Sequence, residues 1–369
     1  MVMRIAVVAL AIAIIPWPDS SGASHAAAQG ARRQRAAKNP NSRPRRQRTG
    51  RQPRADRATQ PPERRPQVPQ NIVVQRNIEY RRVGQRSLAL DLYRPRQAAE
   101  ARLPAVVWIH GGGWRGGGKA RKAWFLHPLV ASGKYVGVSI DYRLSGEATW
   151  PAQIHDCKAA IRYLRAHADE LGIDPQRIGV WGNSAGGHLA SLLGTSGDVE
   201  SLEGDLGPKV VSSRVACAVS TAGPSDFPSY TAGRPRQAQE GGAVFDLLGG
   251  SVEDKAEQAL AASPVTYVTS NDPPFLIMHG TNDRVVPFQQ GELLASRLEE
   301  AGVDTTFVRV VGARHEDYGP EAHRRIMAFF DKHLRRLPVE ISSSPIRFAL
   351  PSNASPPNAS PPKSGVPAN

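Results

Sequence analysis

Cysteine is scarce in this chain of 369 residues, which contains only Cys157 and Cys217. So few cysteines exclude the dense disulfide framework of a small secreted scaffold, and neither has the His or Cys spacing of a metal site nearby. Cys157 shares the apolar stripe of a predicted helix with Ile154 and Ile161, and Cys217 lies in the apolar run 215–219. We therefore expect two buried free thiols that behave as small hydrophobic side chains. A disulfide between them is the alternative.

The chain also lacks an apolar run of the ~20 residues that a transmembrane helix needs. Its N-terminal apolar run has eleven residues, from Ile5 to Ile15, and it follows Arg4 and ends at Pro16. Small residues follow over 26–28. This pattern predicts a signal peptide over residues 1–28 and export to the periplasm or the exterior, with an uncleaved anchor as the alternative. No cysteine lies close after the run, so a lipoprotein anchor is not indicated.

Large apolar side chains are nearly absent from residues 29–70, which are rich in Arg, Gln, Pro and Ala. This composition cannot bury enough surface to fold, so we expect a disordered segment. Residues 1–70 hold fourteen Lys and Arg against three Asp and Glu, whereas the other 299 residues hold 33 against 30. Composition alone favours a solvated linker; the alternative is that the segment binds an anionic polysaccharide or envelope surface. Aromatic residues are absent from 31–65, so nucleic acid is not an expected partner.

A second disordered tail is predicted over residues 338–369, which contain two Asn-Ala-Ser-Pro-Pro repeats. Between the tails, residues 71–337 alternate strand and helix patterns, which predicts one α/β domain with a mostly parallel central sheet and helices on both faces. Residues 223–262 interrupt the alternation and are expected to form a small cap insertion over the site. The predicted strands are 72–82, 86–93, 105–109, 136–140, 177–181, 215–220, 275–279 and 305–311, and the predicted helices are 119–132, 151–167, 184–193, 288–301 and 320–335.

A Gly-Asn-Ser-Ala-Gly sequence occupies residues 182–186, directly after the apolar run 178–181. A Gly-x-Ser-x-Gly between a buried strand and a helix is typical of a nucleophile elbow, a tight turn that presents its serine. The glycines leave room where Cβ atoms would clash. The N-terminus of the following helix favours negative charge that develops on a substrate. Ser184 is therefore the candidate nucleophile.

Two later apolar strands end in loops that carry Asp283 and His315. A carboxylate there can hold an imidazole in the correct tautomer, and a histidine can accept the serine proton and return it to the leaving alcohol. The order Ser184, Asp283, His315 is the order found when a triad is built around this kind of elbow. Asp226 is a weaker competitor for the acid, and His279 is expected to brace the loop.

A His-Gly-Gly-Gly-Trp sequence (110–114) follows the predicted strand 105–109. Glycines let a backbone approach a substrate closely. We expect the N–H groups of Gly112 and Gly113, together with that of Ala185, to bind the developing oxyanion. A plain tight turn is the alternative. Trp114 is the expected substrate-contact residue.

Together, the stretches HGGGW, GNSAGGHLA, LIMHGTNDRVVP and GARH resemble the alpha/beta-hydrolase fold lipase/esterase family. The Trp after the triple glycine is most similar to the feruloyl-esterase-like and acetyl-xylan-esterase-like carbohydrate esterase branch. The resemblance covers about residues 72–336. It implies ester hydrolysis through an acyl-enzyme with Ser184, Asp283 and His315 as the triad, and without a metal or cofactor. The chain departs from this pattern at Glu316-Asp317, where relatives often have small or aromatic residues.

The implied protein is a secreted serine carboxylic-ester hydrolase that acts on short-acyl or acylated-carbohydrate esters. One alternative is an amide or peptide hydrolase of the same fold. Prolyl-peptidase-like enzymes share the Asp283 motif, but they usually carry a large extra domain that this chain lacks. The other alternative is a non-catalytic polyanion-binding protein, against which the intact Ser, Asp and His argue. No motif specifies the acyl group or the alcohol.

Overall fold

The computed structural model describes residues 66–98, 100, 102–197, 199–204, 211–315 and 318–347. Several predictions lie outside these residues: the signal peptide, nearly all of the arginine-rich segment, the Glu316-Asp317 pair and the end of the C-terminal tail. In the described part of the chain, no helix combines the length and the apolar character that crossing a membrane requires.

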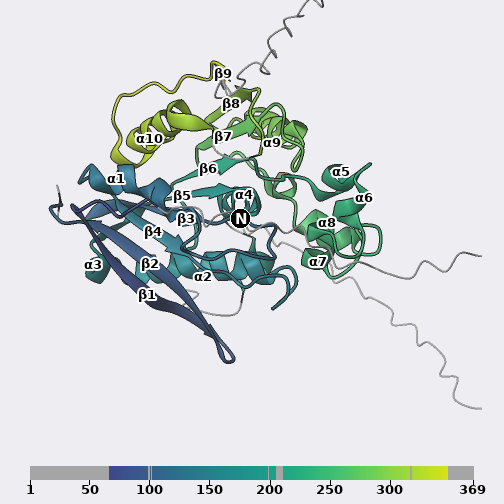
Figure 1. Ribbon diagram of the computed structural model, residues 1–369, viewed down its shortest axis with the longest axis horizontal. Helices are drawn as coiled ribbons and strands as arrows, with labels where there is room; N and C mark the ends of the chain where they lie inside the picture. Colours follow the sequence, from purple (N-terminus) through teal and green to yellow (C-terminus); the bar gives the residue numbers. More distant parts are fainter. Residues whose placement is uncertain are drawn as a thin grey trace, which may run out of the picture. The chain divides into compact units, whose positions relative to one another are not determined.

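Nine strands form one sheet within the described residues, in the order β1-β2-β4-β3-β5-β6-β7-β8-β9 (Figure 1). β2 pairs antiparallel with both β1 and β4, and every other pair is parallel. The strands are β1 (Ile72–Val83), β2 (Arg86–Pro95), β3 (Leu103–Ile109), β4 (Val136–Ile140), β5 (Ile173–Asn183), β6 (Cys217–Thr221), β7 (Phe275–Gly280), β8 (Thr305–Val311) and β9 (Ile346–Arg347). The mostly parallel sheet and all eight predicted strands are thus confirmed.

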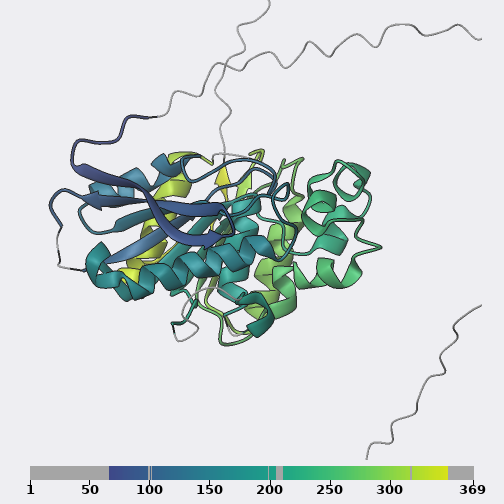
Figure 2. The same ribbon diagram turned by 90° about the horizontal axis from the view of Figure 1, so that it is seen from below.

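Helices cover both faces of this sheet (Figures 1 and 2). Val107 and Ile109 of β3 belong to a core formed with α2, α4 and α9, whereas Val106 and Trp108 belong to a core formed with α1 and α10. β3 is buried along its whole length, as a strand covered on both faces should be. The helices are η1 (Ala123–Leu126), α1 (His127–Ala131), α2 (Ala152–Ala166), α3 (Ala168–Leu171), α4 (Ala185–Thr195), η2 (Glu200–Leu202), α5 (Phe227–Thr231), α6 (Pro235–Ala238), α7 (Ala243–Leu248), α8 (Ala256–Ala261), η3 (Pro264–Tyr267), α9 (Phe288–Glu300) and α10 (Gly319–Arg335).

The helix predicted over 119–132 is wrong in its length, because the structure has only η1 and α1 there. Lys122, which precedes η1, has a left-handed backbone with φ of 54°. Pro128 then occupies the first turn of α1. Proline has no N–H and its ring clashes with a carbonyl one turn earlier, so it ends a continuous helix.

The folded domain extends past both predicted boundaries. Val68 packs against the core that contains α10, although the composition predicts disorder over residues 29–70. Residues 338–347 belong to the predicted tail, yet they include β9, which pairs parallel with β8. Ile346 is only 7% exposed there. An edge strand offers unpaired N–H and C=O groups, so two residues suffice for pairing even though they are too few to show a strand pattern.

The predicted insertion 223–262 contains α5 to α8, which gather at one side of the domain beyond α4 (Figure 1). It contacts the loop after β3, because Arg115 of that loop donates to Gly241 O at 2.8 Å and to Asp246 Oδ2 at 3.0 Å. Elsewhere, the two cysteines are free and buried, as predicted.

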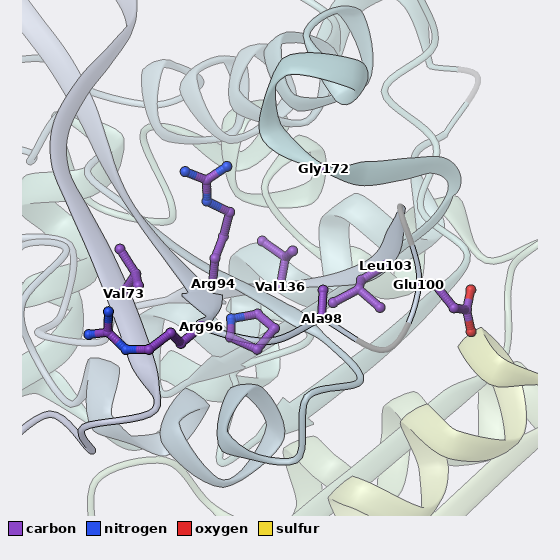
Figure 3. Close-up of a pocket in the computed structure, with 9 residues that line it drawn as sticks. Val73, Arg94, Arg96, Ala98, Glu100, Leu103, Val136 and Gly172 are labelled. Carbon is purple, nitrogen blue, oxygen red and sulfur yellow. The ribbon is translucent and has the colours of Figure 1, made fainter.

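A hollow of about 320 Å³ lies beside the amino ends of β3 and β4 (Figure 3). Leu103 and Val136 on its floor are the first residues of the parallel strands β3 and β4, and Arg94 and Arg96 line it as well. The elbow follows the carboxyl end of β5, so this hollow is separate from the site described next.

Candidate active site

The nucleophile elbow is the turn from β5 to α4. Ser184 has φ of 58° and ψ of −122°, a conformation that costs a non-glycine residue energy and persists only where the surroundings impose it. Its N–H donates to Thr221 O at 2.8 Å. A Cβ at Gly182 would lie 2.0 Å from Gly186 O, and one at Gly186 would lie 2.0 Å from Ile109 O. The turn therefore needs both glycines.

Three predicted side chains form one hydrogen-bonded chain at this elbow. His315 Nε2 lies 2.8 Å from Ser184 Oγ, and His315 Nδ1 lies 2.7 Å from Asp283 Oδ2. The carboxylate is an acceptor, so Nδ1 carries the hydrogen and Nε2 is left to accept from the serine hydroxyl. The His315 side chain is 14% exposed and the Asp283 side chain is fully covered, so only the serine–histidine end meets solvent.

Both carboxylate oxygens of Asp283 are contacted by N–H groups. Oδ1 accepts the N–H groups of Val285 at 2.8 Å and Val286 at 3.0 Å. Oδ2, besides contacting His315, lies 3.3 Å from His279 Nε2. Burial raises the pKa of this carboxyl, but the hydrogen bonds from His279 and His315 and the N–H of Val286 outweigh burial and hold its pKa well below the ordinary value. Asp283 is therefore a carboxylate at neutral pH.

The glycine loop after β3 supplies free N–H groups beside the serine. Gly112 and Gly113 have φ of 130° and 60°, and a Cβ at Gly112 would lie 2.0 Å from Gly116 O. A Cβ at Gly111 would lie 3.1 Å from Ser184 Cβ, so the loop packs against the nucleophile. In the part of the chain that the structure describes, the N–H groups of Gly112, Gly113 and Ala185 reach no backbone carbonyl.

The predicted contact residue Trp114 lies in the core instead of on an open surface, since it is only 2% exposed. Its indole N–H donates to His188 Nδ1 at 3.2 Å, and its ring lies edge-on to Phe227. His188, one turn along α4 from the nucleophile, donates from Nε2 to Ala262 O at 2.6 Å. Burial lowers the pKa of His188 to about 4, so the ring is neutral. We therefore assign Trp114 a supporting position rather than a substrate contact.

Two other polar residues near the site, His110 and the competing acid Asp226, have structural contacts instead. His110 stacks on Tyr142 with ring centroids 4.3 Å apart, and the Tyr142 hydroxyl donates to His110 O at 2.9 Å. Asp226, the competing acid, accepts the N–H of Ser229 and so caps α5. The described residues contain no group of three or more His, Cys, Asp or Glu side chains placed to hold a metal ion.

The parallel sheet, the strand–serine–helix turn, and an acid and a histidine on later loops together define an alpha/beta-hydrolase. A family model matches residues 90–298. The chain belongs to the BD-FAE family of this fold.

Several named relatives are esterases. The chain is 31% identical to Esterase LipC of Mycobacterium tuberculosis (strain ATCC 25618 / H37Rv) over 278 residues, which cover 71% of this chain and 67% of LipC. It spans between 51% and 67% of the lengths of the first three curated relatives that it matches.

Solved structures share the fold. A truncated form of a carbohydrate esterase from gut microbiota matches with a TM-score of 0.64 and 30% identity, covering 71% of this chain and 96% of that one. Thermogutta terrifontis esterase 2 phosphorylated by paraoxon matches with a TM-score of 0.58 and 27% identity, covering 74% and 98%.

Proposed function

We propose that this protein is a serine carboxylic-ester hydrolase whose triad is Ser184, His315 and Asp283. The observation that carries the proposal is the chain of hydrogen bonds, 2.8 Å and 2.7 Å long, that joins the elbow serine to the buried carboxylate through one imidazole. The esterase relatives support it.

In the first half of the reaction, Ser184 Oγ attacks the acyl carbon of the ester and its proton passes to His315 Nε2. Negative charge develops on the carbonyl oxygen. The free N–H groups of Gly112, Gly113 and Ala185 bind this oxyanion, each contributing about 3 kcal/mol to stabilising the transition state. The imidazolium, stabilised by Asp283, gives its proton to the alkoxide, and the alcohol leaves.

In the second half, a water molecule attacks the acyl carbon on Ser184 Oγ while His315 Nε2 takes one of its protons. The bond between Oγ and the acyl carbon breaks, and the same proton returns to Oγ. One ester and one water thus give one alcohol and one carboxylic acid, and the enzyme is restored.

We propose short-acyl or acylated-carbohydrate esters as the substrate class. The likeness to a carbohydrate esterase supports this. The insertion contacts the glycine loop through Arg115, and we propose that it limits the size of groups that bind at the oxyanion donors. Comparing p-nitrophenyl acetate with acetyl p-nitroanilide tests ester against amide hydrolysis. A higher kcat/KM for the anilide would overturn ester specificity.

We also propose that the chain is exported and that residues 29–70 attach it to an anionic polysaccharide or envelope surface, on the strength of their composition. Retention on an immobilised polyuronate, compared with that of a chain lacking residues 29–65, tests the attachment. Retention should disappear by about 0.5 M salt because such contacts are screened. Equal retention of the two chains would refute the proposal. Processing and location of the full chain, followed in cell fractions, test export.

The central experiment is hydrolysis of p-nitrophenyl acetate, butyrate and octanoate by the full chain and by Ser184→Ala. The variant should lose at least ~10³-fold in kcat. Ser191→Ala is the matched control, because this serine lies on the same helix and its hydroxyl bonds Gly187 O instead of the triad. Paraoxon should label the wild type once, at Ser184. A folded wild type that neither hydrolyses these esters nor takes the label would overturn the assignment.

A further inference from the structure

We propose that His279 is a positioning residue for the catalytic acid, a second imidazole that fixes the Asp283 carboxylate in the direction of His315. This inference rests on the proposed function. His279 lies in β7, is fully buried, and places Nε2 3.3 Å from Asp283 Oδ2 and 3.1 Å from Val286 O.

The surroundings of the ring select one tautomer. Both neighbours of Nε2 are oxygen acceptors, so Nε2 carries the hydrogen and points it between them. Nδ1 is buried without a hydrogen-bond partner among the described residues. It faces α9, where a Cβ at Gly291 would lie only 2.7 Å away. Helix α9 therefore closes the space behind the ring and keeps Nε2 directed at the acid loop.

The four donors to Asp283 are not equivalent. The N–H groups of Val285 and Val286 belong to the same loop as the carboxylate and move with it. His315 lies on another loop. His279 alone among the four lies within a strand of the sheet, and strands hold functional groups more precisely than loops do. It is therefore the donor that ties the orientation of Oδ2 to the rigid part of the fold.

His279 Nε2 and His315 Nδ1 both contact the same oxygen of the carboxylate, Asp283 Oδ2. A carboxylate oxygen that already faces one N–H donor is a weaker base toward a second donor, so the proton of the imidazolium stays on His315. His279 has no contact with Ser184 among the hydrogen bonds of the structure, and it acts only through Asp283. Its removal should thus lower kcat and leave KM nearly unchanged.

Two substitutions distinguish the effect of losing the His279 N–H donor from the effect of changing the side-chain volume. His279→Phe keeps a ring of similar size and removes the N–H. His279→Gln carries an amide nitrogen the same number of bonds from Cα as His Nε2, so it can restore the donor. We expect His279→Phe to lose about 30-fold in kcat for p-nitrophenyl acetate, and His279→Gln to stay within about 5-fold of the wild type.

A double-mutant cycle distinguishes positioning from a general structural role. In an Asp283→Asn background the acid is already disabled, so His279→Phe should change kcat by less than about 3-fold. A loss of the same size in both backgrounds would overturn the proposal, and so would a wild-type kcat in His279→Phe. Circular dichroism spectra of all four variants check that each is folded, so partial misfolding does not mimic the effect.

A spectroscopic measurement tests the same point without turnover. The Nδ1 proton of His315, shared with Asp283 over 2.7 Å, should give a resonance far downfield in the proton NMR spectrum of the full chain. It should broaden or vanish in His279→Phe and return in His279→Gln. An unchanged resonance in folded His279→Phe refutes positioning, whatever the esterase assay shows, whereas an inert wild type with the expected NMR pattern refutes only the proposed reaction.

Discussion

The strained serine is a property of single residues, because two glycines alone make its turn possible. Gly186→Ala should destabilise the protein by about 3 kcal/mol, since the new Cβ would lie 2.0 Å from the backbone carbonyl of Ile109, which cannot yield. It should also lower kcat/KM at least ~10²-fold by moving the elbow. Gly116→Ala is the control, because a Cβ there meets nothing within 4 Å. Urea unfolding and ester kinetics check both; equal behaviour of the two variants would contradict the steric argument.

Residue by residue, the sequence predicts what is local. Ser184 and Asp283 each follow a buried apolar strand, and His315 follows the partly exposed strand β8. Each setting is visible in a short stretch of sequence. The bond from the Trp114 indole to His188 joins positions 74 apart in the chain, and no spacing rule links them. The supporting position of Trp114 therefore becomes visible only when packing brings the glycine loop against α4.

At the scale of elements, the strength of the local pattern decides what can be predicted. Buried strands such as β3 are apolar at nearly every position, so all of the central strands are found. The cap helices α6 and α7 have four and six residues, too few for helical periodicity to appear. β9 is shorter still, and its pairing depends on the free edge of β8 rather than on its own sequence.

We expect strand β9 to contribute to the stability of the domain. A chain ending at Leu337 should unfold more easily than one ending at Arg347. The shorter chain loses the burial of Ile346, worth about 2 kcal/mol. It also loses the carbonyl partners of Arg325 at Ser342 and Ser344. Urea midpoints of the two chains measure the difference, and equal unfolding free energies would show that β9 contributes nothing.

At the scale of the whole molecule, the excess of basic residues and the buried groups that affect stability lie in different parts of the chain. The excess of basic residues lies in the first 70 positions, and the remainder is close to balanced. The pH dependence of folding should therefore come from particular buried groups more than from net repulsion. His110 and His188 are such groups, because burial lowers the pKa of each to about 4.

The sign of their effect follows from where the proton binds. An unfolded histidine titrates near 6.5, so below that pH the unfolded chain takes up protons that the folded chain refuses. The stability from each neutral ring is complete above pH 6.5 and is lost as the pH falls toward 4, by about 3 kcal/mol for each ring. The pKa of Asp283 is depressed in the folded protein. This carboxylate therefore adds a further loss of stability as the pH falls, but only below the pKa that the carboxyl has in the unfolded chain.

Unfolding free energies measured between pH 7 and 4 should show this decline in stability. His188→Gln, although less stable at pH 7, should have a shallower slope by about one proton, and an unchanged slope would mean that His188 is not held neutral in the folded protein.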